Sequence, residues 1–592
     1  MIRAALFLLS VTLLAACSPQ SESDFEFQLP FETSEGSKTA TYEQTLEFCE
    51  SIEKASPQVF YTSYGESSQG YKLPLLIVDK DGLNEVEAIR DAGRTILFVE
   101  SNIHPGEPDG NDAMMLLLRD IVTGKKKGLL DSVSIMFAPV VNPDGLKRFG
   151  AYNRINQNGP EKMGWRTNAQ NLNLNRDFVK ADAPAMQAWL RLFDQWQPDF
   201  FIDCHTTDGA DYQYVITYML EIYGNMDPGL TQWQENEYLP YVRDRMFEAG
   251  YPIFPYVSFR SWHDPRSGLI TRPGRPMLSQ GYTALRNRPG LLIETHMLKP
   301  YKERVLATRQ MIELTLERLN KKGSKLQQLI ARADKVVQQS DFRERPFAVA
   351  YRNTDQYDTV SFLGVEYDVV KSDLTGGDWF QYHKGENKTF TLPWYRYPEP
   401  AAKVMLPEAY VIPMQWKTVI ERLELHGIKM IRIEHDTLLP THTYYFTDVK
   451  WRNRPYEGRM GISDFELQSR KDTTPFPSGS VIVPMDQPGA RLIAWMLEPE
   501  SPDSFLQWGF FNAIFEQKEY AETYVMEVKA RRMLENDPEL REAFDAFLAD
   551  NPGVKNSSWA QLNWFYKRTK WWDEKKNVYP VRRVLAEVPG IN

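Results

Sequence analysis

The sequence predicts an α/β domain, with a mixed and mainly parallel sheet flanked by helices, followed by a β-rich C-terminal module. Over the first half of the chain, short runs of Val, Ile, Leu and Phe alternate with longer amphipathic segments, as in βαβ units. The apolar runs show no polar alternation, which is typical of strands buried on both faces. After Asp341, aromatic and β-branched residues alternate with polar ones between Pro and Gly, which predicts antiparallel strands.

Buried strands and helices are expected to alternate along the α/β domain. The strands are expected at 73–78, 95–100, 133–141, 199–203 and 290–294, and the helices at 111–122, 183–196, 231–249 and 301–320. A further helical stretch, 321–339, leads out of this domain. In the C-terminal module, β runs are expected at 357–370 and 389–394, and helices at 414–426 and 517–548.

The first 16 residues have the composition of an export leader. Arg3 precedes the apolar run 4–14, which is shorter than the roughly 20 residues that span a bilayer. The run ends in Leu-Ala-Ala before Cys17, which resembles a lipobox and implies cleavage there and acylation of the cysteine. An ordinary signal peptide is the alternative. Because Ser18 follows, we expect a lipid-anchored protein of the bacterial cell envelope, at the outer membrane, facing the periplasm or the cell surface.

Composition gives the remaining boundaries and excludes several classes of protein. Residues 1–16 are expected to be the signal peptide, 17–40 a solvated tether rich in Ser, Glu and Gln, 41–325 the α/β domain and 340–592 the β-rich module. The formal net charge of −10 is unlike that of a nucleic-acid-binding protein, so no such partner is expected. Three cysteines in 592 residues exclude a disulfide scaffold and a Cys-rich zinc finger.

Two motifs at predicted strand ends carry metal-ligand side chains. His104 and Glu107 follow the strand at 95–100, and His205 follows the strand at 199–203. Zinc accepts imidazole nitrogen and carboxylate oxygen together, and sheet enzymes assemble their sites at the carboxyl ends of strands. Each motif alone is weak, because a surface His–Glu pair or a structural histidine is the commoner case.

Two further motifs place charged residues where the neighbouring sequence offers little opposite charge. Arg166 and Arg176 lie in a loop rich in amides and poor in acids, which suits recognition of an anion, although its asparagines could simply satisfy turns. Glu294 ends an apolar strand, where a carboxylate is unfavourable unless it has a partner or a function. A structural ion pair is the alternative for Glu294.

Together, in this order, the four motifs resemble those of the M14 zinc carboxypeptidases, the carboxypeptidase A family, over residues 41–320. The resemblance implies that His104, Glu107 and His205 ligate one zinc ion per chain, with a water as the fourth ligand. It implies that Glu294 is the general base toward this water and then the proton donor to the leaving amine.

The same resemblance assigns the substrate contacts. Arg166 would stabilise the oxyanion, and Asn175 and Arg176 would bind the free α-carboxylate of the substrate. Asn173 stands where the family often has the aspartate that orients the first zinc histidine. The family's substrate-capping tyrosine is unassigned, because no tyrosine occurs at 257–281.

The predicted function is that of a zinc metallocarboxypeptidase, a hydrolase that releases C-terminal residues from peptides with a free carboxylate. The alternative is a zinc amidohydrolase or peptidase acting on peptidoglycan stem peptides or N-acyl amino acids, which would use the same metal site. A binding protein with a relict catalytic domain is a third hypothesis, which the complete set of ligands and Glu294 disfavours. The membrane is expected as a partner through the lipid anchor only.

Replacement of Cys17 by serine is expected to abolish lipidation, because the thiol sulfur carries the diacylglycerol. Mass spectrometry of the mature N-terminal peptide, together with membrane fractionation of wild type and Cys17→Ser, measures this. A wild-type protein that fractionates as soluble and carries no lipid would contradict the lipobox interpretation.

Overall fold

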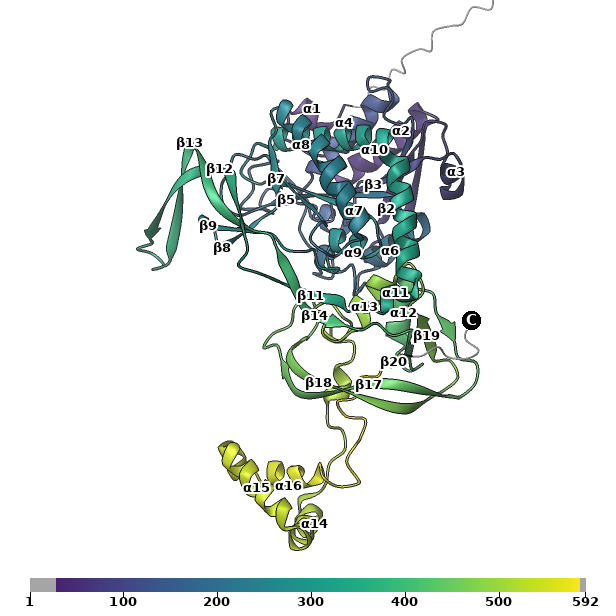
Figure 1. The fold of residues 1–592 in the computed structure, drawn as a ribbon. Coiled ribbons are helices and arrows are strands. Elements are labelled where there is room, and N and C mark those ends of the chain that lie inside the picture. Colours follow the sequence, from purple (N-terminus) through teal and green to yellow (C-terminus); the bar gives the residue numbers. More distant parts are fainter. Residues whose placement is uncertain (1–27, 586–592) are drawn as a thin grey trace, which may run out of the picture.

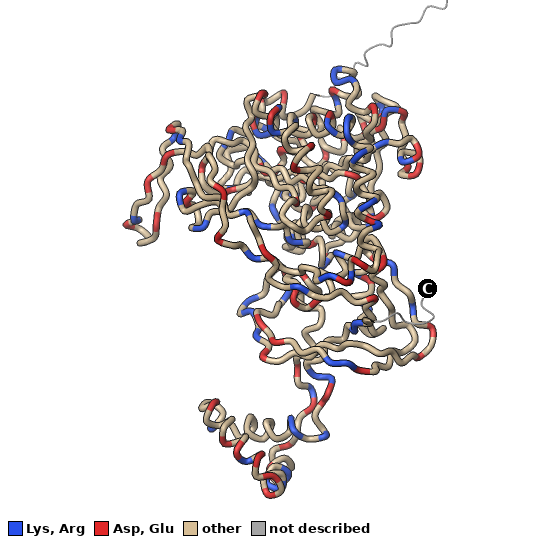
Figure 2. Tube along the Cα trace, viewed as in Figure 1, with Lys and Arg blue, Asp and Glu red and all other residues tan. Residues whose placement is uncertain are grey.

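The computed structural model describes residues 28–585 (Figure 1). The expected signal peptide and Cys17 lie outside the described residues. Among the helices of the described chain, none combines the length and the apolar character needed to cross a bilayer. Lys and Arg are interspersed with Asp and Glu over all parts of the described chain (Figure 2).

A mixed eight-stranded sheet forms the centre of the N-terminal half, which confirms the predicted α/β class. Its order is β1-β2-β4-β3-β5-β10-β6-β7, and β4, β3, β5 and β10 run parallel at its centre. The strands are β1 Val59–Glu66, β2 Lys72–Val78, β3 Thr95–Glu100, β4 Val133–Ala138, β5 Phe200–Thr207, β6 Ile216–Leu220, β7 Ile253–Pro255 and β10 Gly290–His296.

Helices cover both faces of this sheet (Figure 1). Phe98 of β3 packs in the same core cluster as Trp189 of α6, whereas its neighbour Leu97 packs in the cluster that contains Leu117 of α4. Alternate side chains of one strand therefore enter two cores, as expected for a strand buried on both faces. The helices of this part are α1 Pro30–Thr33, α2 Tyr42–Ala55, α3 Val86–Asp91, α4 Asp109–Val122, α5 Pro143–Lys147, α6 Pro184–Trp196, α7 Pro228–Trp233, α8 Leu239–Glu248, α9 Ser279–Leu285 and α10 Tyr301–Gln338.

The helix expected at 301–320 and the helical stretch expected at 321–339 form one continuous helix, α10. Leu326, Ile330 and Val337 keep its apolar side against the core beyond residue 325, where the α/β domain was expected to end. Close approach of α10 to the sheet requires Gly323, where an added Cβ would lie 2.0 Å from Thr95 Oγ1.

The tether expected at 17–40 is wrong over its described end. Leu29 and Phe31 are buried in the core cluster that contains the α4 residues, and the ring of Phe31 meets that of Tyr301 edge-on at 6.0 Å. Burial of these two apolar side chains favours packing of this segment onto the domain.

The C-terminal region is β-rich, as predicted. It forms a six-stranded sheet with the order β16-β19-β15-β20-β17-β18, and β11 pairs with β14. Its strands β12 and β13 join the β8–β9 hairpin of the α/β domain in a four-stranded sheet, β12-β13-β9-β8, which protrudes as an arm (Figure 1). The strands are β8 Ser258–Ser261, β9 Asp264–Ile270, β11 Phe347–Asn353, β12 Asp358–Lys371, β13 Asp378–Tyr395, β14 Pro398–Val404, β15 Ala409–Ile412, β16 Ile431–Arg432, β17 Thr437–Trp451, β18 Ile462–Phe476, β19 Val481–Pro484 and β20 Arg582–Val584.

The two halves share one apolar core. Leu423 of α12 and Trp495 of α13 belong to the same buried cluster as Trp189 of α6. The helix expected at 517–548 is instead two helices, α14 and α15, broken at Asp537 and Pro538, which with α16 enclose a small cluster of their own. The remaining helices are α11 Ser340–Arg343, α12 Lys417–Leu425, α13 Ala490–Leu497, α14 Thr523–Asn536, α15 Pro538–Asp550 and α16 Ser558–Tyr566.

Candidate metal centre and substrate cavity

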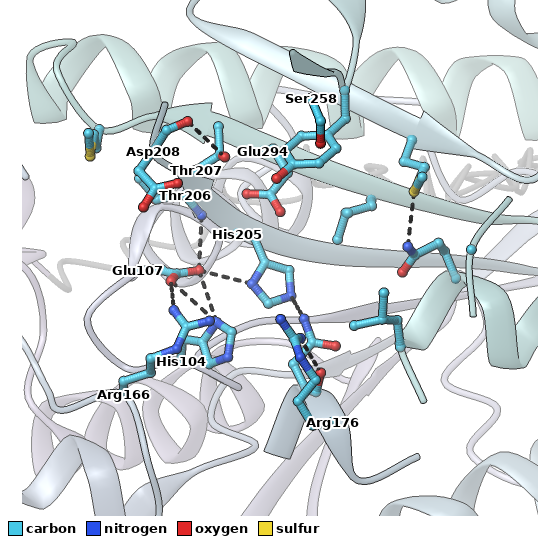
Figure 3. A pocket seen from close by; sticks show the side chains of 18 of the residues that line it. His104, Glu107, Arg166, Arg176, His205, Thr206, Thr207, Asp208, Ser258 and Glu294 are labelled. Carbon is cyan, nitrogen blue, oxygen red and sulfur yellow. Dashed lines mark hydrogen bonds and ion pairs between the residues drawn. The ribbon is translucent and has the colours of Figure 1, made fainter. Parts of the chain in front are cut away.

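The predicted site residues meet at the carboxyl ends of the central parallel strands. His104 and Glu107 lie in the loop after β3, His205 lies on β5, and Glu294 lies on β10. In the register of β5 and β10, Glu294 is the direct neighbour of His205. The close-up shows these four side chains gathered around one space (Figure 3).

His104, Glu107 and His205 form a buried group that could hold a metal ion. Their candidate ligand atoms all lie within 4.8 Å of one another. Both imidazoles present Nδ1 to the Glu107 carboxylate, at 3.2 Å from His104 to Oε1 and 2.9 Å from His205 to Oε2. The Thr206 backbone N–H also donates to Glu107 Oε2, at 3.0 Å.

The far nitrogen of each imidazole is held by a second residue. His104 Nε2 lies 2.8 Å from Asn173 Oδ1, and His205 Nε2 lies 2.8 Å from Asp203 Oδ2. An Nε2–H that donates to these oxygens leaves Nδ1 as the lone-pair nitrogen, which is how proteins orient metal-ligating histidines. Asn173 thus makes the contact expected of an aspartate, but without its charge.

Asp203 is a site residue that the sequence interpretation missed. Two residues apart on β5, Asp203 and His205 point to the same face of the strand, whereas Cys204 points to the other face, against α4. Asp203 also accepts a hydrogen bond from Ser279 Oγ at 2.6 Å. The spacing of two on a strand was the signal that could have identified it.

Burial and neighbouring charges shift the pKa values of the three candidate ligands. Burial alone would raise the pKa of Glu107, but His104 and Arg154 hold it well below its usual range. Burial lowers the pKa of His104 to about 4, so that this imidazole is neutral. Burial would also lower the pKa of His205, but Asp203 and Glu107 hold it well above its usual range, so a metal ion would displace a proton there.

Two nitrogen donors and one carboxylate fit zinc and leave one coordination position for water, as catalytic zinc sites do. The donor set is therefore compatible with the predicted cofactor. Mg²⁺ and Ca²⁺ favour all-oxygen sets, which two imidazoles do not supply.

Glu294 faces the same space without a partner. Its Oε2 atom is buried and accepts no hydrogen bond from any residue of the described chain. Burial raises the pKa of Glu294 to about 8, while the positive charge of His205 opposes this shift. A half-buried carboxylate whose buried oxygen has no partner, beside a three-donor group, matches the expected general base, because a bound cation would favour its ionised form.

Two arginines contact the candidate ligand Glu107. Arg166, predicted from sequence, lies with Nη1 3.2 Å from Glu107 Oε1. Arg154 donates to the same oxygen through Nη2 and was missed, because an arginine in an irregular loop carries no distinguishing pattern. Both line the cavity, so positive charge surrounds the place where an oxyanion would form.

Asn175 and Arg176 lie on the short 3₁₀ turn Leu174–Arg176 and line the cavity as well. The Asn175 amide nitrogen lies 3.1 Å from His205 Nε2. Arg176 donates from Nε to the hydroxyl of Tyr456, at 3.1 Å, and from Nη1 to the Asn175 carbonyl. Tyr456 comes from the C-terminal region, and nothing in the local sequence predicted this contact.

The cavity has a volume of about 730 Å³, which suits a small peptide end. Tyr256 lines it, one residue before the range in which the sequence offered no tyrosine. The β8–β9 hairpin follows Tyr256 and separates it in the chain from Glu294. Burial raises the pKa of Tyr256 to about 12, so its hydroxyl stays protonated and can donate. Other lining residues are Asp208, Met219, Ile270, Arg272, Arg275, Leu278, Gln280 and Leu292.

Known proteins with similar sequences are carboxypeptidases. Residues 45–218 match the zinc carboxypeptidase family, Peptidase M14, and this range holds every predicted site residue of the α/β domain except Glu294. Carboxypeptidase 2 of Trichophyton rubrum is 24% identical over 499 residues, which cover 80% of this chain and 85% of that protein.

Solved structures that match part of this chain include carboxypeptidases. A metallo-carboxypeptidase from Burkholderia cenocepacia is 17% identical and covers 48% of this chain and 70% of its own, with a TM-score of 0.35. Carboxypeptidase A from Helicoverpa armigera is 15% identical and covers 52% of this chain and 78% of its own, with a TM-score of 0.36.

His104→Ala and His205→Ala are each expected to lose the metal, because each removes one of three protein ligands. Elemental analysis of protein purified without chelator should give one zinc per wild-type chain and a strongly reduced content in either variant. His435→Ala, at an exposed histidine of the C-terminal region, is the control that should keep zinc. A zinc content near zero in the wild type would contradict the assignment.

Proposed function

We propose that this chain, a metallocarboxypeptidase with an M14 zinc carboxypeptidase domain, cuts C-terminal residues from peptides with zinc at His104, Glu107 and His205 and with Glu294 as general base. One observation carries the proposal. The three donors, the unpartnered Glu294 carboxylate and two arginines suited to anions line one cavity of peptide-end size.

The chemistry that zinc supplies when bound is Lewis-acid activation of a water and of the scissile carbonyl. Glu294 takes a proton from the attacking water through its free oxygen. As the C–N bond of the peptide breaks, Glu294 returns this proton to the leaving amine nitrogen. Two roles for one carboxylate are possible because Glu294 lies beside His205 on the neighbouring strand and holds no competing hydrogen bond at Oε2.

Arg166 is proposed to donate to the carbonyl oxygen as negative charge develops on it. One such donor is typically worth about 3 kcal/mol in the transition state. Arg166 reaches Glu107 at 3.2 Å, so its guanidinium already borders the reacting position. Tyr256, with its protonated hydroxyl in the cavity, is proposed to cap the substrate, the role for which the sequence offered no residue.

Asn175 and Arg176 are proposed to bind the terminal carboxylate. A guanidinium forms charge-assisted hydrogen bonds with a carboxylate, and the Asn175 amide adds a further donor. This contact presents the last peptide bond to the metal site, which makes the enzyme an exopeptidase. Arg272 on the cavity wall disfavours a basic side chain at the substrate terminus.

The second candidate is a zinc amidohydrolase or peptidase of peptidoglycan stem peptides or N-acyl amino acids. It would use the same donors and the same base, so the catalytic centre does not separate the two. Retention of both Asn175 and Arg176 at the cavity favours a substrate with a free α-carboxylate, which such stem peptides also have.

The cellular place of the enzyme is a separate proposal. The apolar run 4–14 and the Leu-Ala-Ala sequence before Cys17 support lipid attachment at Cys17, with the catalytic domain held at the bacterial cell envelope.

Glu294→Gln is expected to retain zinc and to lose hydrolysis by about 10²- to 10⁴-fold, because the amide has nearly the same shape but cannot accept the proton. Steady-state turnover of a peptide and elemental analysis of the same sample measure this. Glu303→Gln, an exposed glutamate on α10, is the matched control. Near-normal turnover of Glu294→Gln with zinc bound would assign the base to another residue.

A peptide pair that differs only in a C-terminal carboxylate or amide tests the proposed substrate class. Amidation and Arg176→Ala should each lower kcat/KM about ten- to hundredfold, since a charge-assisted hydrogen bond is worth about 1.5–3 kcal/mol. Their combination should cost less than the sum of the two, because either change removes the same contact. Equal cleavage of acid and amide would move the function toward an amidase or an endopeptidase.

A further inference from the structure

A loop of the C-terminal region reaches the proposed carboxylate-binding turn. Residues 452–461 connect β17 to β18, and Tyr456 at the tip of this loop accepts a hydrogen bond from Arg176 Nε at 3.1 Å. Beside it, Glu457 Oε2 accepts from the Asn173 backbone N–H at 2.9 Å. The residues that the α/β domain contributes to carboxylate recognition are thus held from outside that domain.

The tip of this loop is built as a tight turn. Tyr456 and Arg459 exchange backbone hydrogen bonds of 2.9 and 3.0 Å, and both residues between them have left-handed backbone, with φ of 50° at Glu457 and 75° at Gly458. Two such residues in succession are typical of a type I′ turn, in which Gly is favoured. The turn therefore presents Tyr456 in a defined direction.

Two more contacts fix the turn, one with the α/β domain and one within the C-terminal region. Arg459 forms a two-pronged ion pair with Asp182, with Nε 2.9 Å from Oδ2. The ring of Tyr456 lies nearly parallel to that of Trp508, at 6.1 Å and 20°. Because the turn is anchored on both sides, the position of the Tyr456 hydroxyl does not depend on its bond to Arg176.

The geometry at Arg176 leaves one nitrogen for a ligand. Nε is bound to the Tyr456 hydroxyl and Nη1 to the Asn175 carbonyl, at 2.5 Å. Nη2 has no hydrogen-bond partner within residues 28–585. Two of the three nitrogens thus set the plane of the guanidinium, and the third remains available to a carboxylate.

The residue that orients Arg176 is a neutral phenol, and this affects the charge that Arg176 offers to a ligand. Arg275, the other cavity arginine that contacts the C-terminal region, is held by the buried carboxylate of Asp503, with Nε 3.1 Å from Oδ2. A carboxylate cancels the charge of the arginine that it orients, whereas a neutral phenol orients the group and leaves its charge in place. Arg176 therefore keeps the charge that an anionic terminus needs.

We propose that Tyr456 is a positioning residue for recognition of the substrate carboxylate and that it acts through Arg176. The C-terminal region thereby completes the substrate site of the α/β domain. This inference rests on the proposed function, because it assumes that Arg176 meets a C-terminal carboxylate.

Tyr456→Phe removes the hydroxyl and keeps the ring against Trp508. For the free-acid peptide, KM should rise about two- to tenfold with little change in kcat, because a hydrogen bond at a tyrosine that is 40% exposed contributes modestly. For the amidated peptide, KM should stay unchanged. Tyr445→Phe is the matched control, because the Tyr445 hydroxyl lies on the same hairpin but bonds to Asp472, at 3.0 Å.

A double-mutant cycle separates positioning from a merely structural effect. In the Arg176→Ala background, Tyr456→Phe should change nothing further, because its effect passes through the guanidinium. Zinc content and melting temperature should equal those of the wild type. An equal rise of KM for acid and amide, or an undiminished effect without Arg176, would overturn the inference.

Cleavage of the free-acid and amidated peptides by the wild type distinguishes failure of the inference from failure of the proposed function. A wild type that prefers the acid, together with a Tyr456→Phe variant with unchanged KM, overturns the role of Tyr456 alone. A wild type that cuts acid and amide alike overturns carboxylate recognition by Arg176, and the inference falls with it.

Discussion

The buried carboxylate of Glu107 is the group on which the site depends. It lies between the Nδ1 atoms of two imidazoles, accepts the Thr206 backbone N–H and pairs with Arg154 and Arg166. A buried carboxylate without such partners would be strongly unfavourable, so its presence forces the surrounding chain to supply positive charge and donors. The same convergence of nitrogen and oxygen donors makes the place suitable for zinc, and it brings the Arg166 guanidinium beside the candidate ligands.

The central sheet makes this convergence possible. β3, β5 and β10 are neighbours and run parallel, so their carboxyl ends open on one side, and the register sets Glu294 beside His205. Strand alternation then sorts the side chains of β5. Asp203 and His205 face the site, and Cys204 packs behind them against Gly110 of α4, where no larger residue fits.

The C-terminal region contacts residues of the same cavity from outside the α/β domain. It shares an apolar core with α6, which fixes its position against the α/β domain. From this fixed position it meets two cavity arginines in different ways, Arg275 through a carboxylate and Arg176 through a phenol. A module whose own sequence shows no catalytic motif can therefore influence substrate binding through the groups that it orients.

The sequence by itself determined the α/β class, the β-rich C-terminal region and the positions of the candidate ligands, because strand burial and motif spacing are local properties. Arg154, Tyr256 and Tyr456 came from the tertiary structure alone, whereas Asp203 could have been identified from its two-residue spacing to His205. The β8–β9 hairpin lies between Tyr256 and Glu294 in the chain, and Tyr456 reaches Arg176 across 280 residues. Such contacts form between elements that are far apart in the sequence. They depend on how these elements pack against one another, which local sequence patterns do not specify.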